Sequence, residues 1–218
     1  IQRRSSMAKF VWPIPDKGIR RRLHRVTAAT LILWGDADRA NPLVYAEEWQ
    51  RRIKGAAVRH RRGGHMILLE APDAAAKAVA LARSGEVQAL MKGSLHTDEL
   101  LHEVAKADTG LRTERRLSHV FVMDVPTYPR ALFITDAAIN IYPSLDDKRD
   151  ICQNAIELAH ALGIAEPRVA ILSAVETVYP KIQSTLDAAA LCKMADRGQI
   201  TGGLLDGPLA FDNAVSEK

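Results

Sequence analysis

The fold class follows from one stretch, Thr30-Leu31-Ile32-Leu33-Trp34-Gly35-Asp36-Ala37-Asp38. Its first five residues form a continuous apolar run, which is typical of a strand buried on both faces of a parallel sheet. Gly35 and the acidic residues around Ala37 predict a turn after the strand. Helical spacing over 43–53 and a short strand over 56–60 follow. The order strand, helix, strand predicts an α/β fold.

The alternation of helices and strands continues along the chain. Ser144 and Asp147 have the spacing of a helix-opening capping box, and Ser184 and Asp187 repeat that spacing. Two apolar runs flank the turn-rich segment 126–129, which predicts a hairpin and therefore a mixed second sheet. The remaining expected elements are helices over 74–83, 97–107, 144–162 and 184–197 and strands over 119–125, 131–135, 168–175 and 200–205.

Composition and charge narrow the class of protein. A content of 47% hydrophobic and 26% charged residues suits a globular domain with a core. No apolar run reaches the roughly 20 residues of a membrane-spanning helix. The basic run over 20–25 favours a solvated surface helix over a nucleic-acid site, since neither zinc-ligand spacing nor interleaved aromatic residues accompany it. Cys152 and Cys192 are expected to be buried, reduced thiols, so we expect a cytoplasmic protein without a membrane or nucleic-acid partner.

Two motifs in the first third of the chain have the order of a hydrolase acid and base. Asp38 ends the first strand and is followed by Asn41-Pro42, and His65 lies in Gly63-Gly64-His65-Met66. Residues 10–72 therefore resemble the C-terminal segment of an α/β hydrolase, which implies Asp38 as catalytic acid and His65 as base. The alternatives are a turn or capping carboxylate and a polar loop residue. No G-x-S-x-G supplies a nucleophile, so hydrolysis by this chain is not expected.

A longer series of motifs occupies the rest of the chain. It comprises Met91-Lys92-Gly93-Ser94-Leu95-His96-Thr97, Gly110-Leu111-Arg112-Thr113, Ser118-His119-Val120, Phe133-Ile134-Thr135-Asp136-Ala137-Ala138-Ile139-Asn140 and Asp206-Gly207-Pro208-Leu209-Ala210. In this order and spacing they resemble the phosphate acetyl/butyryltransferase family over residues 77–218. The resemblance implies transfer of a short acyl group between coenzyme A and phosphate without a metal. It also implies two α/β subdomains with the site between them, usually in a homo-oligomer.

The acyltransferase-like motifs contain candidate substrate-binding residues. Lys92, Gly93 and Ser94 offer a cation, bare backbone and a hydroxyl at a helix start, which suits an anion site, although an ordinary helix start with a surface lysine fits equally. Thr97 belongs to the same motif, and His96 is a candidate proton relay or a structural hydrogen-bonding residue. Asp136 and Asn140 follow a buried strand, where α/β sheets bind ligands, but loop capping is the alternative. Thr201-Gly202-Gly203 offers close-approach glycines without the lysine of a phosphate-binding loop.

The two resemblances together predict a composite chain. We expect an incomplete α/β-hydrolase C-terminal segment over 1–76, joined to a phosphate acyltransferase core over 77–218 that is truncated at both ends. The family's later Ser-Arg phosphate contact and carboxylate base have no counterpart before Lys218, so we expect the chain alone to be inactive. The alternatives are an esterase-like remnant and a non-catalytic fusion product or interaction module. The sequence does not distinguish acetyl from butyryl preference.

Overall fold

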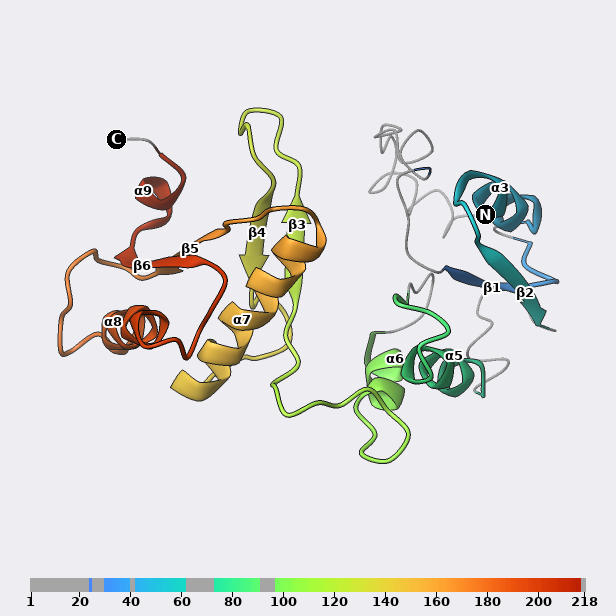
Figure 1. Cartoon of the computed structure of the whole chain (residues 1–218), viewed down its shortest axis with the longest axis horizontal. Helices are drawn as coiled ribbons and strands as arrows, with labels where there is room; N and C mark the ends of the chain where they lie inside the picture. Colours follow the sequence, from blue (N-terminus) through green and yellow to red (C-terminus); the bar gives the residue numbers. More distant parts are fainter. Residues whose placement is uncertain (1–23, 25–29, 40–41, 62–72, 91–96, 217–218) are drawn as a thin grey trace, which may run out of the picture. The chain divides into compact units, whose positions relative to one another are not determined.

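The computed structural model describes residues 24, 30–39, 42–61, 73–90 and 97–216 (Figure 1). The chain forms two compact units, residues 1–112 and residues 113–218. The boundary predicted between residues 76 and 77 marks a change of sequence resemblance. Spatial contacts do not test that boundary, which stays a prediction.

The first unit opens with a strand–helix–strand repeat. Its elements are β1 (Leu31–Gly35), α3 (Val44–Arg52) and β2 (Ala57–Arg61). The two strands pair in parallel, with Leu31 opposite Ala57. Ala46 of α3 is fully buried and Ile53 at its end is 3% exposed, so the apolar positions of the helix provide the packing face. The two strands and the helix that the sequence predicts within 30–60 are confirmed, and their bounds agree within one residue.

Two further helices complete the described part of this unit. They are α5 (Asp73–Arg83) and α6 (Thr97–Val104), and α6 ends three residues before the predicted 107. After α6 the chain folds back, because the Leu111 amide donates to the Val104 carbonyl at 2.8 Å. Nη1 of Arg83 donates to the Gly110 carbonyl at 3.1 Å. A Cβ at Gly110 would lie 2.3 Å from the Val104 carbonyl oxygen, so this motif glycine is required by packing.

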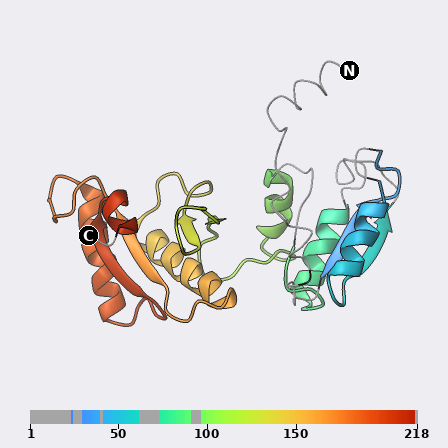
Figure 2. The ribbon, with the colours of Figure 1, turned by 90° about the horizontal axis from the view of Figure 1, so that it is seen from above.

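The described residues of the second unit form a hairpin, a parallel strand pair and three helices, which can be followed in Figures 1 and 2. The hairpin strands β3 (Val120–Met123) and β4 (Leu132–Thr135) are antiparallel, and β5 (Arg168–Leu172) and β6 (Leu204–Leu209) are parallel. The helices are α7 (Leu145–Ala161), α8 (Gln183–Asp196) and α9 (Phe211–Val215). Figure 1 shows α7 beside the hairpin, and α8 and α9 on opposite faces of the β5–β6 pair.

The core of the second unit lies between α7, α8 and the parallel strands. Its buried members are Cys152, Ile156, Leu191 and Ile200. The packing face of α7 is formed by its buried apolar residues Ile151, Cys152, Ala155, Ile156 and Ala159, whereas Leu162 directly after the helix is 56% exposed. Both cysteines are free thiols; Cys152 is buried and Cys192 half-buried. Burial raises the pKa of Cys152 to about 11, with a smaller contribution from Cys192.

Three predicted features of this unit are wrong. The hairpin does not join a mixed sheet, since each sheet among the described residues has two strands. Ser184 and Asp187 do not cap α8, because the helix begins at Gln183 without a side-chain cap. Their polar atoms have distant partners instead: Ser184 Oγ lies 2.7 Å from Ser173 Oγ, and Asp187 pairs with Lys148 of α7. The last strand also begins at 204 rather than 200.

The last strand begins four residues later than predicted because Thr201, Gly202 and Gly203 pack against α7 instead of joining the strand. Gln153 of α7 brackets Thr201, with Nε2 at 3.1 Å from its carbonyl oxygen and Oε1 at 2.9 Å from its amide. His160 Nε2 lies 2.7 Å from the Gly202 carbonyl oxygen. Gly202 has a φ of +83°, and a Cβ there would lie 2.6 Å from His160 Cε1. The two glycines therefore allow the backbone to pass close against α7.

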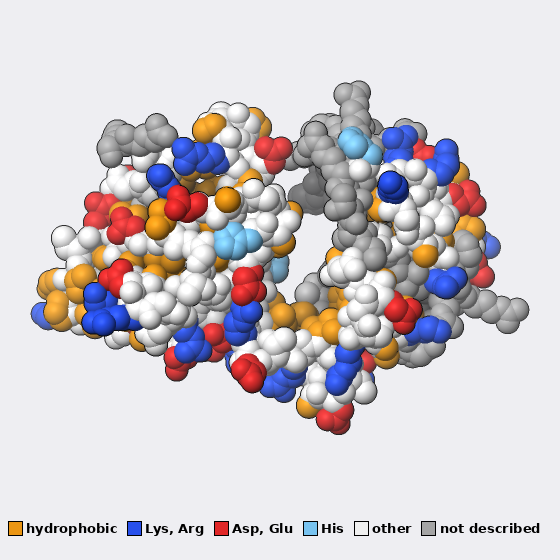
Figure 3. Space-filling model, viewed as in Figure 1, with side chains coloured by type: hydrophobic (Ala, Val, Ile, Leu, Met, Phe, Trp, Pro, Cys, Tyr) orange, Lys and Arg blue, Asp and Glu red, His pale blue; other side chains and the backbone are white. Residues whose placement is uncertain are grey.

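The described surface carries charges of both signs. Figure 3 shows Lys and Arg interspersed with Asp and Glu over the face it draws. The predicted basic run over 20–25 lies outside the described residues except for the exposed His24. Within the described part of the chain, none of the helices combines the length and apolar character needed to cross a membrane.

Candidate functional site

The carboxyl end of β4 carries the loop that contains two predicted site residues. Asp136 directly follows the strand, and its Oδ1 accepts hydrogen bonds from the amides of Ala138 at 3.0 Å and Ile139 at 3.1 Å. Its Oδ2 accepts from the Asn140 amide at 3.2 Å and also from Asn140 Nδ2. The carboxylate therefore closes its own loop, which is the arrangement that the capping alternative predicted.

The hydrogen bonds of this loop also set the charge state of Asp136. Burial by itself would raise its pKa. The bonds donated by the amides of Ala138 and Ile139 and by Asn140 outweigh that effect, and they hold the pKa of Asp136 below its ordinary value. The carboxylate is therefore ionised at neutral pH and stabilised where it lies, which makes it a poor general base for a proton transfer.

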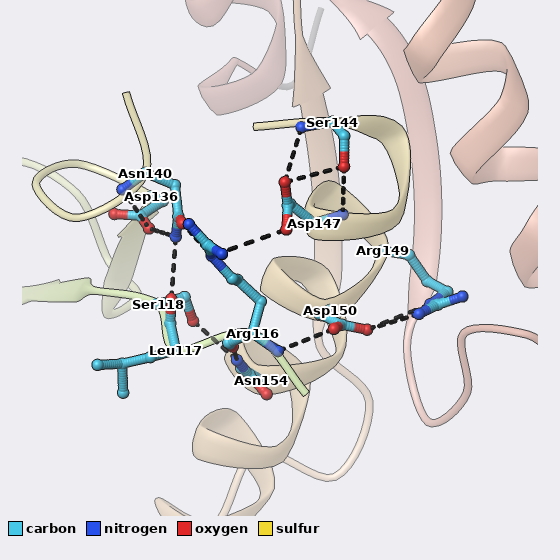
Figure 4. A network of polar contacts seen from close by, with 10 residues as sticks. All are labelled: Arg116, Leu117, Ser118, Asp136, Asn140, Ser144, Asp147, Arg149, Asp150 and Asn154. Atoms are coloured by element: carbon cyan, nitrogen blue, oxygen red, sulfur yellow. Dashed lines mark hydrogen bonds and ion pairs between the residues drawn. The ribbon is translucent and has the colours of Figure 1, made fainter. Parts of the chain in front are cut away.

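Asn140 connects this loop to the segment that precedes β3 (Figure 4). Its Nδ2 donates to the Leu117 carbonyl at 2.9 Å as well as to Asp136. Its Oδ1 accepts a 2.8 Å hydrogen bond from Arg116 Nε. Both N–H donors of the amide and one lone pair of its oxygen are thus engaged within the protein. A substrate that accepts a hydrogen bond from Asn140 would have to displace Asp136 or the Leu117 carbonyl.

One face of α7 holds the same segment along its length. Asp150 Oδ2 accepts from the Arg116 amide at 2.9 Å, and Asn154 Nδ2 donates to the Arg116 carbonyl at 2.8 Å and to Ser118 Oγ at 2.9 Å. Glu157, one turn further, forms a 2.8 Å ion pair with Arg115. Because residues three and four apart share a helix face, these three side chains form one polar stripe. The stripe fixes the segment 115–118 on the helix.

The start of α7 is closed by the predicted capping box. Ser144 Oγ accepts from the Asp147 amide at 3.2 Å, and Asp147 Oδ2 accepts from the Ser144 amide at 2.9 Å. The amide and hydroxyl of Ser144 lower the pKa of Asp147, with a smaller contribution from Arg116. Arg116 Nε lies 3.7 Å from Asp147 Oδ1. The loop after β4, the segment before β3 and the beginning of α7 are therefore tied into one network.

The other predicted site residues lie apart from this network or outside the described residues. Five of them lie outside the described residues: His65, Lys92, Gly93, Ser94 and His96. Thr97 is exposed and is the first residue of α6. Asp38 is half-buried in the turn after β1, with its amide donating to the Gly35 carbonyl at 3.2 Å. Among the four predicted residues that the structure describes, it brings together Asp136 and Asn140. The roles of all nine residues in binding or catalysis stay predictions.

Sequence reasoning missed Arg116, the cation in contact with both Asn140 and the start of α7. Arg115 and Arg116 form a basic pair, and nothing in their spacing distinguishes the two side chains. No group of three potential metal ligands occurs among the described residues. The site that the structure describes is a polar, internally hydrogen-bonded scaffold at the carboxyl end of β4.

Comparison with known proteins adds the family to this geometry. The family described as phosphate acetyl/butaryl transferase matches residues 22–218. The chain belongs to this acyltransferase family. Over 181 residues it is 63% identical to a phosphate acetyltransferase of Rhizobium meliloti, covering 81% of this chain and 57% of that protein. Over 145 residues it is 50% identical to a phosphate butyryltransferase of Clostridium acetobutylicum, covering 66% and 48%.

A solved structure extends the family comparison to the fold. The crystal structure of a branched-chain phosphotransacylase from Enterococcus faecalis V583 matches with a TM-score of 0.68 at 26% identity. The match covers 86% of this chain and 71% of that one. The α/β fold is therefore that of a phosphotransacylase. The chain spans about half the length of the curated relatives it matches.

The comparisons bear unequally on the two predicted resemblances. The phosphate acetyl/butyryltransferase resemblance is confirmed by the family match and by the relatives. Nothing in the comparisons supports a separate hydrolase segment before it, and the family match already begins at residue 22. The hydrolase-like segment over 10–72 and a composite origin of the chain are therefore not established by these comparisons.

Proposed function

We propose that this chain carries part of a phosphate acyltransferase, which exchanges a short acyl group between coenzyme A and inorganic phosphate. The observation that carries the proposal is the family match over residues 22–218, together with 63% identity to a phosphate acetyltransferase. Relatives of both the acetyl and the butyryl type match this chain, so the proposal covers short acyl groups as a class.

The chemistry sets three requirements on the protein. An oxygen of the hydrogen phosphate dianion attacks the thioester carbonyl, and the tetrahedral intermediate collapses as the C–S bond breaks. The phosphate gives up its proton and the leaving coenzyme A thiolate takes up one, so the net reaction consumes no proton. The protein must hold the phosphate dianion, donate hydrogen bonds to the oxyanion and pass the proton from phosphate to sulfur. We assign the anion contact to Lys92, Gly93 and Ser94, with Thr97 at the adjoining helix start. In this proposal His96 is the candidate proton relay.

Asp136 and Asn140 take a different part in the proposed site. Their polar atoms are already engaged, so they shape the loop at the carboxyl end of β4 rather than transfer protons. Ala137 and Ala138 of that loop are exposed and small, which allows a ligand to approach the backbone closely.

Phosphate-dependent release of coenzyme A tests the proposal. The chain is incubated with acetyl-CoA or butyryl-CoA and phosphate; the free thiol is measured with a thiol reagent and the acyl phosphate by ³¹P NMR. Coenzyme A binding is measured separately by calorimetry, so that substrate recognition is detected independently of turnover. Lys92→Ala should weaken phosphate-dependent binding, whereas Lys77→Ala on the exposed side of α5 should not. Absence of both binding and turnover would refute the proposal.

The hydrolase-like prediction has one supporting observation. Asp38 follows β1 in a parallel pair whose strands are joined by α3, which is the setting that a hydrolase acid needs. We infer that residues 1–218 alone do not hydrolyse esters, since they contain no G-x-S-x-G motif. Hydrolysis of p-nitrophenyl acetate above the rate with Asp38→Asn would contradict that inference.

A further inference from the structure

Arg116 lies where three parts of the second unit meet. Its backbone amide and carbonyl are bound by Asp150 and Asn154 of α7, at 2.9 Å and 2.8 Å. Its side chain donates from Nε to Asn140 Oδ1 at 2.8 Å, and the same Nε lies 3.7 Å from Asp147 Oδ1 in the first turn of α7. The backbone of Arg116 is thus fixed to α7 while its guanidinium reaches the loop after β4 (Figure 4).

Asn140 links Arg116 to Asp136, because its amide bonds to both side chains. The two donors of its amide group are directed at the Asp136 carboxylate and the Leu117 carbonyl, and neither acceptor tolerates a flipped amide with oxygen in that place. The amide oxygen consequently faces away from them and needs a donor, which Arg116 supplies. A charged donor makes this a stronger bond than a neutral one would be. The order of contacts is α7, Arg116, Asn140, Asp136, and then the loop amides.

We propose that Arg116 is a positioning residue of the acyl-transfer site: it holds the loop 136–140 in its binding geometry through Asn140, without touching the substrate itself. This inference rests on the proposed function. It assigns to Arg116 a task that its neighbour does not share, because Arg115 pairs with Glu157 and Asn154 on α7 and makes no contact with the loop.

The pair of arginines provides a matched control. Arg116→Gln and Arg115→Gln remove the same charge from adjacent exposed positions of one segment, but only the first loses the donor to Asn140. Arg116→Lys keeps the charge and one donor on a shorter, non-planar head group, and should restore part of the effect. Asn140→Ala removes the residue through which Arg116 acts. Arg116→Gln should therefore add little once Asn140 is gone.

Two readouts distinguish positioning from a general loss of stability. Hydrogen exchange measured by mass spectrometry reports the protection of the Ala138, Ile139 and Asn140 amides, and calorimetry reports the dissociation constant of coenzyme A. For Arg116→Gln we expect about tenfold less protection of these amides and about tenfold weaker coenzyme A binding, since the charge-assisted bond to Asn140 is lost together with the longer contact with Asp147. Arg115→Gln should change each quantity by less than twofold.

The outcomes separate this inference from the proposed function. Equal effects of Arg116→Gln and Arg115→Gln on exchange would overturn the inference, whatever happens to coenzyme A. Lower protection in Arg116→Gln with unchanged coenzyme A binding would also overturn it, because the ordered loop would then not serve the site. If the unaltered chain binds no coenzyme A, the proposed function and the link of this loop to acyl transfer both fail. If Arg116→Gln does not fold, the comparison of Arg116→Lys with Arg115→Lys decides the question in the same two measurements.

Discussion

Replacing Asp136 by Asn tests whether the carboxylate, rather than a carbonyl oxygen alone, holds the loop after β4. The Asn side chain keeps one acceptor for the amides of Ala138 and Ile139. Its NH₂ group, however, would face the amide and side-chain donors of Asn140. Two bonds to a charged acceptor are lost, each worth about 1.5–3 kcal/mol when fully buried. The loop is only half-buried and water competes there, so we expect a loss of about 2 kcal/mol in the free energy of unfolding.

Urea denaturation followed by circular dichroism measures this loss, and Asp146→Asn provides the control. Asp146 is 80% exposed and has one ion pair, 3.3 Å from Arg149, so its loss should cost about 0.5 kcal/mol or less. The effect of Asp136→Asn must also depend on pH. The folded pKa of Asp136 lies below that of the unfolded chain, about 3.9, so the carboxylate stabilises the fold above that value. Its contribution disappears as the pH falls through the folded pKa. Equal costs for the two variants at pH 7, or a cost that persists unchanged at pH 2, would refute the reasoning.

Three further predictions concern the packing of the second unit. Gly202→Ala should lower the free energy of unfolding, measured by urea denaturation, by about 2 kcal/mol, and the control Gly198→Ala should lower it by about 1 kcal/mol. Both glycines have a positive φ, but only at Gly202 would the added Cβ lie 2.6 Å from an imidazole carbon. Equal costs would show that the close approach is unimportant. Asp187→Ala should lower the free energy of unfolding by about 2 kcal/mol in the same measurement, because it leaves the partly buried Lys148 of α7 unpaired. If Asp187→Asn is as stable as the unaltered protein, the charge of Asp187 does not contribute. With a pKa of about 11, the thiol of Cys152 should be alkylated by iodoacetamide at pH 8 at least tenfold more slowly than in urea, as mass spectrometry of the labelled peptide would measure; equal rates would contradict its burial.

Much of the site remained hidden from sequence reasoning because its contacts are long-range. Asp136 and Asn140 were rightly placed after a strand, although β4 is half-buried rather than buried, and spacing did not decide between ligand binding and loop closure. The deciding partner, Arg116, lies 24 residues before Asn140. In the same way, Ser184 and Asp187 fit a capping pattern, but Asp187 pairs with Lys148, 39 residues away, and the helix begins without them. A local sequence pattern shows which hydrogen bonds neighbouring residues can form with one another. It does not show which distant residue the fold brings close enough to take their place.

The sequence by itself determined the α/β class, the capping box at Ser144, the hairpin and membership of the acyltransferase family, because these depend on apolar periodicity, near-neighbour hydrogen bonding and motif order. Only the tertiary structure decided that Asn140 is enclosed by its own protein and that Gly202 passes against α7. The physical reason is that a polar side chain bonds to whichever partner the fold brings within about 3 Å, and that distance is set by packing rather than by sequence separation.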